Sequence, residues 1–111
     1  MLRKSVAIEE ELGRKEGMAS DYSNLGVILR HGGDLEGAEA MHRKALAIDE
    51  ELGRKEGMAY NYGNLGVIAV QRGDAAEARR LWMLARDLYV QMGARPDVEQ
   101  IQGWLDGLPQ N

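Results

Sequence analysis

Acidic side chains gather in two short runs of the sequence and could supply acid–base chemistry. These runs are Glu9–Glu11 and Asp49–Glu51. Two neighbouring carboxylates can act as general acid and base where their surroundings separate their pKa values. Each run lies near the expected C-terminal end of a helix, where the helix dipole is unfavourable to anions, and basic residues follow closely at Arg14-Lys15 and Arg54-Lys55. We therefore interpret both runs as solvated surface charge.

The two histidines, His31 and His42, fall on different expected helices and have no acidic or Cys partner at metal-ligand spacing. This placement favours a structural or solvated role over metal binding or general-base catalysis. The glycines do not form the Gly-x-x-x-x-Gly-Lys-Ser/Thr or Gly-x-Gly-x-x-Gly motifs of phosphate-binding loops. The sequence thus predicts no enzyme activity, no metal site and no cofactor.

The composition limits the classes of partner. The net charge of −4 argues against a nucleic-acid or anionic-membrane surface, both of which call for a basic stripe. No apolar run approaches the roughly 20 residues of a membrane span. Glu9, Glu10 and Glu11 stand where a signal peptide would have its apolar centre and cleavage site, so we expect cytoplasmic residence. The absence of Cys excludes disulfides and thiolate metal sites.

The sequence repeats itself with an offset of forty residues. At that offset the run Glu10–Ala19 matches Glu50–Ala59 without a mismatch. A period of this length indicates one supersecondary unit stacked on copies of itself, since a single unit cannot bury its own apolar face.

Apolar residues at helical spacing assign an element to almost every segment. Met18, Tyr22, Leu25 and Leu29 predict one buried stripe, and Asp34 is a suitable N-cap for the longer helix after it. No segment alternates apolar and polar residues over a strand length, so we expect an all-α chain of antiparallel helical hairpins. The expected array spans residues 1–108: an unpaired helix over 1–12, a polar loop over 13–17, a first unit over 17–52, a second over 57–92, a capping helix over 96–108 and a tail over 109–111.

Two copies of one motif carry a family resemblance. The first reads Tyr22-x-x-Leu25-Gly26-x-x-Leu29, Gly33-Asp34, Ala38-x-x-x-His42 and Ala45, and the second reads Tyr62-x-x-Leu65-Gly66-x-x-Ala69, Gly73-Asp74, Ala78-x-x-x-Trp82 and Ala85. This spacing resembles the tetratricopeptide repeat. The resemblance implies an α-solenoid that winds as a right-handed superhelix, in which Gly26 and Gly66 allow the two helices of a hairpin to approach closely.

The repeat is longer than the 34 residues of the family's usual unit. Glu50 and Val90 stand in place of its closing proline, so the second helix can continue for another turn. This long variant resembles the repeats of kinesin light chains, of the spindle adaptor that binds G-protein α subunits, and of many bacterial regulators. Those proteins bind peptides. The near-identity of the two copies in this sequence fits either recent duplication or an engineered consensus.

The resemblance implies that the concave face binds a peptide or helical segment of a partner protein. Asn24 and Asn64 occupy the position where the family's asparagine hydrogen-bonds a ligand backbone, although an asparagine bridging to the neighbouring hairpin is equally compatible with the sequence. This face offers chiefly Arg30 as a basic group, which argues against a clamp for a C-terminal carboxylate. The same face is expected to present Ser20, Val27, Arg30, His31, Tyr60, Val67 and Gln71.

The N-terminal helix lacks a partner helix in the expected array. Its apolar residues Leu2, Val6, Ile8 and Leu12 would have no cover from the same chain, and terminal repeats need a polar outer face. We expect either a fragment of a longer array or a homodimer with two-fold symmetry through residues 1–29. The leading functional expectation is a non-enzymatic binding module, and the alternative is a structural module that acts by self-assembly.

Overall fold

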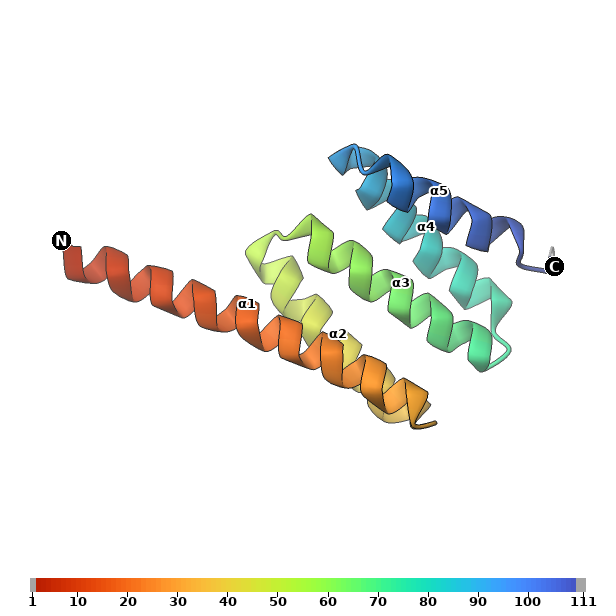
Figure 1. The fold of residues 1–111 in the computed structure, drawn as a ribbon, viewed down its shortest axis with the longest axis horizontal. Helices are drawn as coiled ribbons and strands as arrows, with labels where there is room; N and C mark the ends of the chain where they lie inside the picture. Colours follow the sequence, from red (N-terminus) through yellow and green to blue (C-terminus); the bar gives the residue numbers. More distant parts are fainter. Residues whose placement is uncertain (1, 110–111) are drawn as a thin grey trace.

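A computed structural model describes the backbone of residues 2–109 and the side chains of residues 8–109. The described chain is helical, with no strand, and consecutive helices pack against each other as in an α-solenoid (Figure 1). The predicted fold class is therefore confirmed. The helices are α1 (Leu2–His31), α2 (Leu35–Leu52), α3 (Lys55–Gln71), α4 (Ala75–Met92) and α5 (Arg95–Asp106).

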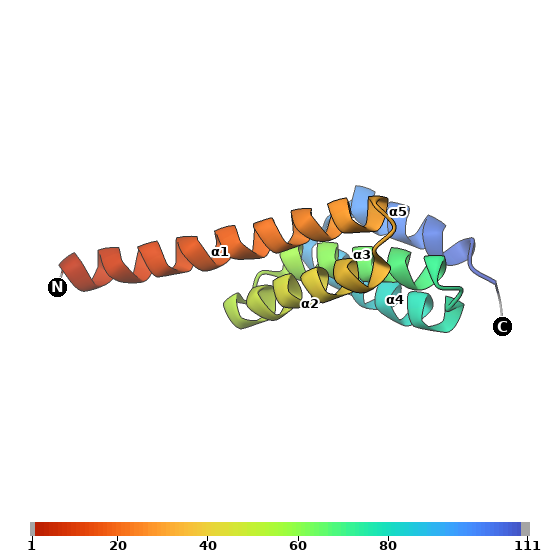
Figure 2. The same cartoon turned by 90° about the horizontal axis from the view of Figure 1, so that it is seen from below.

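The helices form two layers. Figure 2 shows α1, α3 and α5 in one layer and α2 and α4 in the other, within overall dimensions of 57 × 32 × 18 Å. Aspartates cap the second-layer helices: the Gly37 amide donates to Asp34 Oδ1 at 2.8 Å, and the Glu77 amide donates to Asp74 Oδ1 at 3.1 Å. These caps fix where each long helix begins. None of the helices described here combines the length and apolarity needed to cross a membrane.

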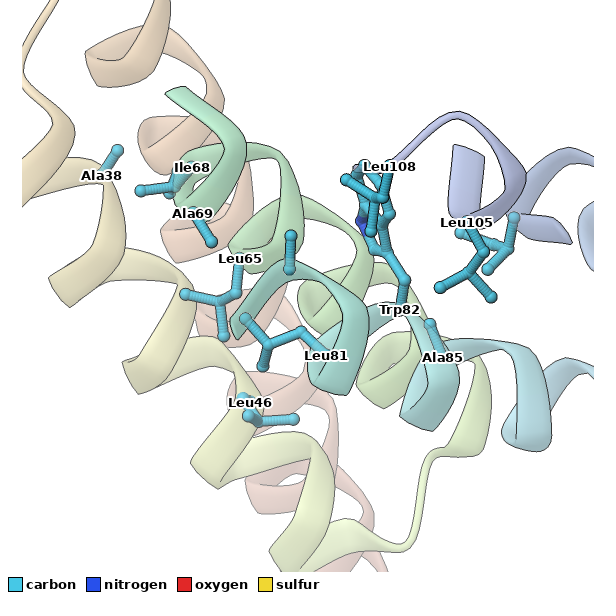
Figure 3. Close-up of a cluster of buried hydrophobic side chains, with 12 residues drawn as sticks. Ala38, Leu46, Leu65, Ile68, Ala69, Leu81, Trp82, Ala85, Leu105 and Leu108 are labelled. Carbon is cyan, nitrogen blue, oxygen red and sulfur yellow. The ribbon is translucent and has the colours of Figure 1, made fainter. Parts of the chain in front are cut away.

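The apolar core lies between α2, α3, α4 and α5 (Figure 3). Ile68 from α3 and Leu81 from α4 are 1% and 2% exposed. Ala38, Ala78 and Ala85 are fully buried, which lets neighbouring helices approach closely because an alanine side chain occupies little space between them. Burial of this apolar surface is the main favourable term that holds the stack together.

Residues 2–12 are helical as expected, but the predicted end of that helix at residue 12 and the loop over residues 13–17 are wrong. Helix α1 continues without a break from Leu2 to His31. A Cβ added at Gly13 or Gly17 would meet nothing within 4 Å, so no neighbouring element forces the chain to turn there. A glycine inside a helix costs only about 1 kcal/mol relative to alanine, and the helix tolerates both.

The matching segment forty residues later, between α2 and α3, does turn, and its contacts explain why. Gly53 adopts φ +69°, a left-handed conformation that ends α2. Asp49 supports the turn by accepting hydrogen bonds from Arg54 at 3.1 Å and from Asn61 at 3.2 Å. Forty residues earlier the equivalent positions hold Glu9 and Asp21, so the same turn would bring two carboxylates together and lose the Asn61 bond.

The buried stripe expected on the first short helix is only partly correct. Leu25 is 42% exposed and Met18 is 46% exposed, whereas Ala19, Ser23 and Gly26 are buried. The buried residues are those on the side of α1 that faces the rest of the stack. Leu25 and Met18 lie on another side of the helix, where no helix of the described chain covers them.

Candidate functional site

Two adjacent cavities lie along the helices of the first layer. One, of about 350 Å³, lies between α1 and α3, and the other, of about 330 Å³, lies between α3 and α5. Three residues line both cavities: Tyr60, Tyr89 and Asp97. We name the two cavities together the α1–α3–α5 groove. The first cavity is lined mainly by polar and charged residues, and Val67, Ile101 and Trp104 add apolar surface in the second.

A buried polar network forms part of the wall of the first cavity. Asn61 is fully buried and its amide oxygen accepts two bonds, from Ser23 Oγ at 2.9 Å and from His42 Nδ1 at 3.1 Å. Its amide nitrogen donates to Asp49 Oδ2 at 3.2 Å and to the Gly57 carbonyl at 2.9 Å. Asn61 on α3 therefore ties α1 and α2 together beneath the groove, and its hydrogen bonds restrict how the three helices can be arranged.

Burial controls the ionisation of this network. It lowers the pKa of His42, with the Arg30 charge acting in the same direction and the bond to Asn61 opposing it. Because His42 Nδ1 donates to an amide oxygen, the neutral ring carries its proton there, and Nε2 is buried without a hydrogen-bond partner among the described residues. Burial therefore favours the neutral form of His42, against the effect of its bond to Asn61.

Asp49 corrects one expectation about the acidic runs. It is 2% exposed, so this residue is not solvated surface charge, although Glu50, Glu51 and Glu9 are exposed. Burial raises the pKa of Asp49, and the neighbouring Arg54 guanidinium opposes that shift. The exposed neighbours obscured this role in the sequence, because only the position of Asp49 faces Asn61 and the turn.

The predicted close approach at Gly26 and Gly66 is confirmed. A Cβ at Gly26 would lie 2.6 Å from His42 Nε2, and a Cβ at Gly66 would overlap the Trp82 ring. The Trp82 indole also donates to the Gly63 carbonyl at 3.0 Å. His42 and Trp82 thus fill the same slot in successive hairpins, and their rings set the distance between the helices.

The groove contains only some of the predicted binding residues. Asn24 lines the first cavity and Asn64 the second, so the two amides occupy equivalent places. Asn64 Nδ2 donates to the Tyr60 carbonyl of its own helix at 2.9 Å rather than to another hairpin. Ser20, Tyr60 and Val67 also line the groove, and the predicted residues outside its lining are Val27, Arg30, His31 and Gln71.

Several lining residues escaped the sequence analysis, chiefly because α5 was expected to act only as a cap. Gln100 and Trp104 line the second cavity from α5, and Tyr89 reaches both cavities from α4. The repeat itself contains the missed signal: Gln100 lies forty residues after Tyr60, and Trp104 forty after Asn64. Helix α5 therefore supplies to the groove the positions that α3 supplies one repeat earlier.

The groove presents both hydrogen-bonding and charged side chains. Its amides, tyrosines and carboxylates can orient a ligand through hydrogen bonds and charge. Among the described side chains, no three histidines or carboxylates lie close enough together to hold a metal ion. Of the residues predicted to mediate self-association, Leu2 and Val6 lie outside the described side chains, whereas Ile8 and Leu12 are 60% and 44% exposed.

Comparison with known proteins agrees with the geometry. A family model described as tetratricopeptide repeat matches residues 17–91, which is more than half of the chain. The chain belongs to the tetratricopeptide repeat family. No curated protein matched it. Tetratricopeptide repeats are in general protein–protein interaction modules, and the paired helices and the small residues at their contacts fit such a repeat.

Proposed function

We propose that this tetratricopeptide repeat chain binds a peptide or helical segment of a partner protein in the α1–α3–α5 groove. The observation that supports the proposal most strongly is the placement of Asn24 and Asn64 at equivalent positions in two adjoining cavities. A segment lying across both cavities would meet one amide in each, at places one repeat apart. An amide offers both a donor and an acceptor, which suits the alternating groups of a peptide backbone.

Substitution of both amides tests this proposal. The Asn24→Ala/Asn64→Ala variant is expected to lose capture of the partner while its unfolding midpoint in urea stays close to that of the wild type, since Asn24 is exposed and Asn64 is only partly buried. Full capture by the double variant would contradict groove binding.

Cross-linking gives a direct readout of where the partner lies. A photoreactive phenylalanine analogue at Tyr60 is expected to cross-link the captured partner, because Tyr60 lines both cavities. The same analogue at Met83, which is 42% exposed on α4 and outside the groove, is the matched control. Cross-linking from Met83 and not from Tyr60 would contradict the proposal.

Self-association is a second candidate function, supported by the exposed apolar side chains along α1. Ile8, Leu25 and Ile28 are 60%, 42% and 65% exposed. A two-fold dimer through residues 1–29 would bury the same patch on both subunits. Sedimentation should then give twice the 12.3 kDa chain mass, and Leu25→Glu/Ile28→Glu should give the single mass, with Met83→Glu as the control. A monomer at all concentrations would contradict the dimer.

A further inference from the structure

The α1–α3–α5 groove has a distinct centre where its two cavities meet. Tyr60, Tyr89 and Asp97 line both cavities and come from three different helices, α3, α4 and α5. Tyr60 is 45% exposed, so its ring presents a face that a ligand can reach. Any segment that crosses from one cavity to the other must pass these three side chains.

The charge around this junction is negative and only partly compensated. The groove lining contains three carboxylates, Asp49, Glu56 and Asp97, and one guanidinium, Arg54. Arg54 is already paired with Asp49 at 3.1 Å. Within residues 8–109, Glu56 and Asp97 make no ion pair. Two of the three carboxylates are thus left without an ion pair, because the one guanidinium of the lining is paired with the third.

Tyr89 lies within reach of this negative charge. Burial raises the pKa of the Tyr89 hydroxyl, and the negative charges of Asp97 and Glu56 raise it further. Both carboxylates therefore act on the same ring, although they come from different helices. The tyrosine ring lies where a cation would gain from both.

Aromatic rings and carboxylates together match one class of ligand group. The face of an aromatic ring attracts ammonium and guanidinium groups, and Tyr60 and Tyr89 supply two rings at the junction. Asp97 supplies the opposite charge, while Trp104, 38% exposed in the second cavity, offers apolar surface beyond it. A neutral or acidic side chain would leave the carboxylates without a partner and partly desolvated.

We propose that the junction formed by Tyr60, Tyr89 and Asp97 seats a lysine or arginine side chain of the bound segment. This inference rests on the proposed binding of a partner segment in the groove and adds the chemistry of that segment. It assigns a cationic side chain to the junction and an apolar side chain to the adjoining surface of Trp104 and Val67.

Titration with a small probe tests the junction without knowledge of the partner. N-acetyl-arginine amide, added to the ¹⁵N-labelled chain at physiological salt, is expected to shift the resonances of Tyr60, Tyr89 and the Trp104 indole. N-acetyl-citrulline amide has nearly the same shape without the charge and should bind about 5- to 10-fold more weakly. Equal binding of the two probes, or shifts confined to other surfaces, would overturn the inference.

Matched aspartate variants separate a binding role from a structural one. Asp97 lies in the first turn of α5, where a carboxylate also stabilises the helix dipole. Asp97→Asn is expected to weaken the arginine probe about 3- to 10-fold. Asp106→Asn, on the same helix but outside the groove, should leave it unchanged. Unchanged probe binding by a folded Asp97→Asn chain would show that the carboxylate is structural only.

The captured partner distinguishes failure of this inference from failure of groove binding. If the Tyr60 cross-link joins a partner segment that lacks a lysine or arginine beside the cross-linked position, the cationic assignment is wrong and groove binding stands. If no cross-link forms at Tyr60, groove binding itself is contradicted.

Discussion

The chain contains the same ten residues twice, in two different conformations. Glu10–Ala19 forms an uninterrupted part of α1, whereas Glu50–Ala59 ends one helix, turns at Gly53 and begins the next. The local sequence therefore does not decide the structure of this segment. The contacts of the flanking residues decide the conformation. Asp49 accepts a hydrogen bond from Asn61 beside the second copy, and Glu9 and Asp21 occupy the equivalent positions beside the first copy.

The units differ in burial as well as in conformation. Ile68 is 1% exposed and its equivalent Ile28 is 65% exposed, while Leu65 and Leu25 are 2% and 42% exposed. Helix α2 covers α3, and no described helix covers the equivalent side of α1. The same side chain thus stabilises the fold strongly in one unit and little in the other.

Truncation of the equivalent isoleucines gives the largest expected difference between the units. Ile68→Ala removes core contacts and leaves a cavity, so it should reduce the free energy of unfolding by about 2–5 kcal/mol. Ile28→Ala should change it by less than about 1 kcal/mol because the side chain is already largely in water. Urea titration of both variants measures the difference. Equal losses would mean that the exposed side of α1 is covered in solution.

The paired glycines give the next largest effect. Gly66→Ala would push a methyl group into the Trp82 ring, which its hydrogen bond to Gly63 holds in place, so we expect a loss on the order of 1–3 kcal/mol. Gly26→Ala should cost less, because the smaller His42 ring faces it with a nitrogen that makes no hydrogen bond. Thermal unfolding of both variants checks this order, and a more stable Gly66→Ala chain would contradict the packing.

The sequence was sufficient for the helices and hairpins, because apolar spacing, aspartate caps and small residues all indicate them locally. The repeat offset also identified Gly26 and Gly66 as contact points. The repeat offset gave a wrong prediction at residues 13–17. It suggested a second turn there, but the Asp49–Asn61 hydrogen bond that supports the later turn has no equivalent. Identity of ten residues could not reveal that loss, which depends on Glu9 and Asp21 outside the identical run.

The groove was predictable only in outline. Asn24 and Asn64 were located because their side of the helix follows from its period. Tyr89 and Asp97 were missed, since they reach the groove from α4 and α5, and which helices surround a cavity depends on how the hairpins stack. The negative field at the junction likewise depends on charges that only the fold brings together.

Glycine-to-alanine changes at the equivalent positions Gly13 and Gly53 should have opposite effects on stability, because Gly13 lies inside a helix and Gly53 lies in a turn. Gly53→Ala places a side chain at φ +69° and should reduce the free energy of unfolding by about 1 kcal/mol. Gly13→Ala lies inside α1 with open space around it and should raise the local helix population. Urea titration measures the first effect, and ¹³Cα chemical shifts of residues 8–17 measure the second. Loss of helical shifts in Gly13→Ala would show that the segment turns in solution.

The smallest expected effect is a pH dependence of the free energy of unfolding that comes from His42. His42 fills in the first hairpin the place that the non-titrating Trp82 fills in the second. Because burial lowers the pKa of His42 in the folded chain, the unfolded chain binds the proton more readily. The stability that neutral His42 contributes is present above the unfolded pKa near 6.5 and is lost as the pH falls through the folded pKa. Between pH 7 and pH 6 the loss should be less than about 1 kcal/mol.

Variants at the two histidines isolate the pH-dependent contribution of His42 to stability. His31 is exposed, so His31→Gln should keep the fall of the urea midpoint on acidification, and His42→Gln should reduce it. The same comparison separates the effect of His42 from that of Asp49. The raised pKa of Asp49 has the opposite effect on the free energy of unfolding: the stability that it contributes is present below the unfolded pKa and is lost as the pH rises through the folded pKa. Since both variants retain Asp49, equal slopes in His42→Gln and the wild type would mean that His42 is not held neutral by burial, and the difference between the two aromatic slots would then be one of size alone.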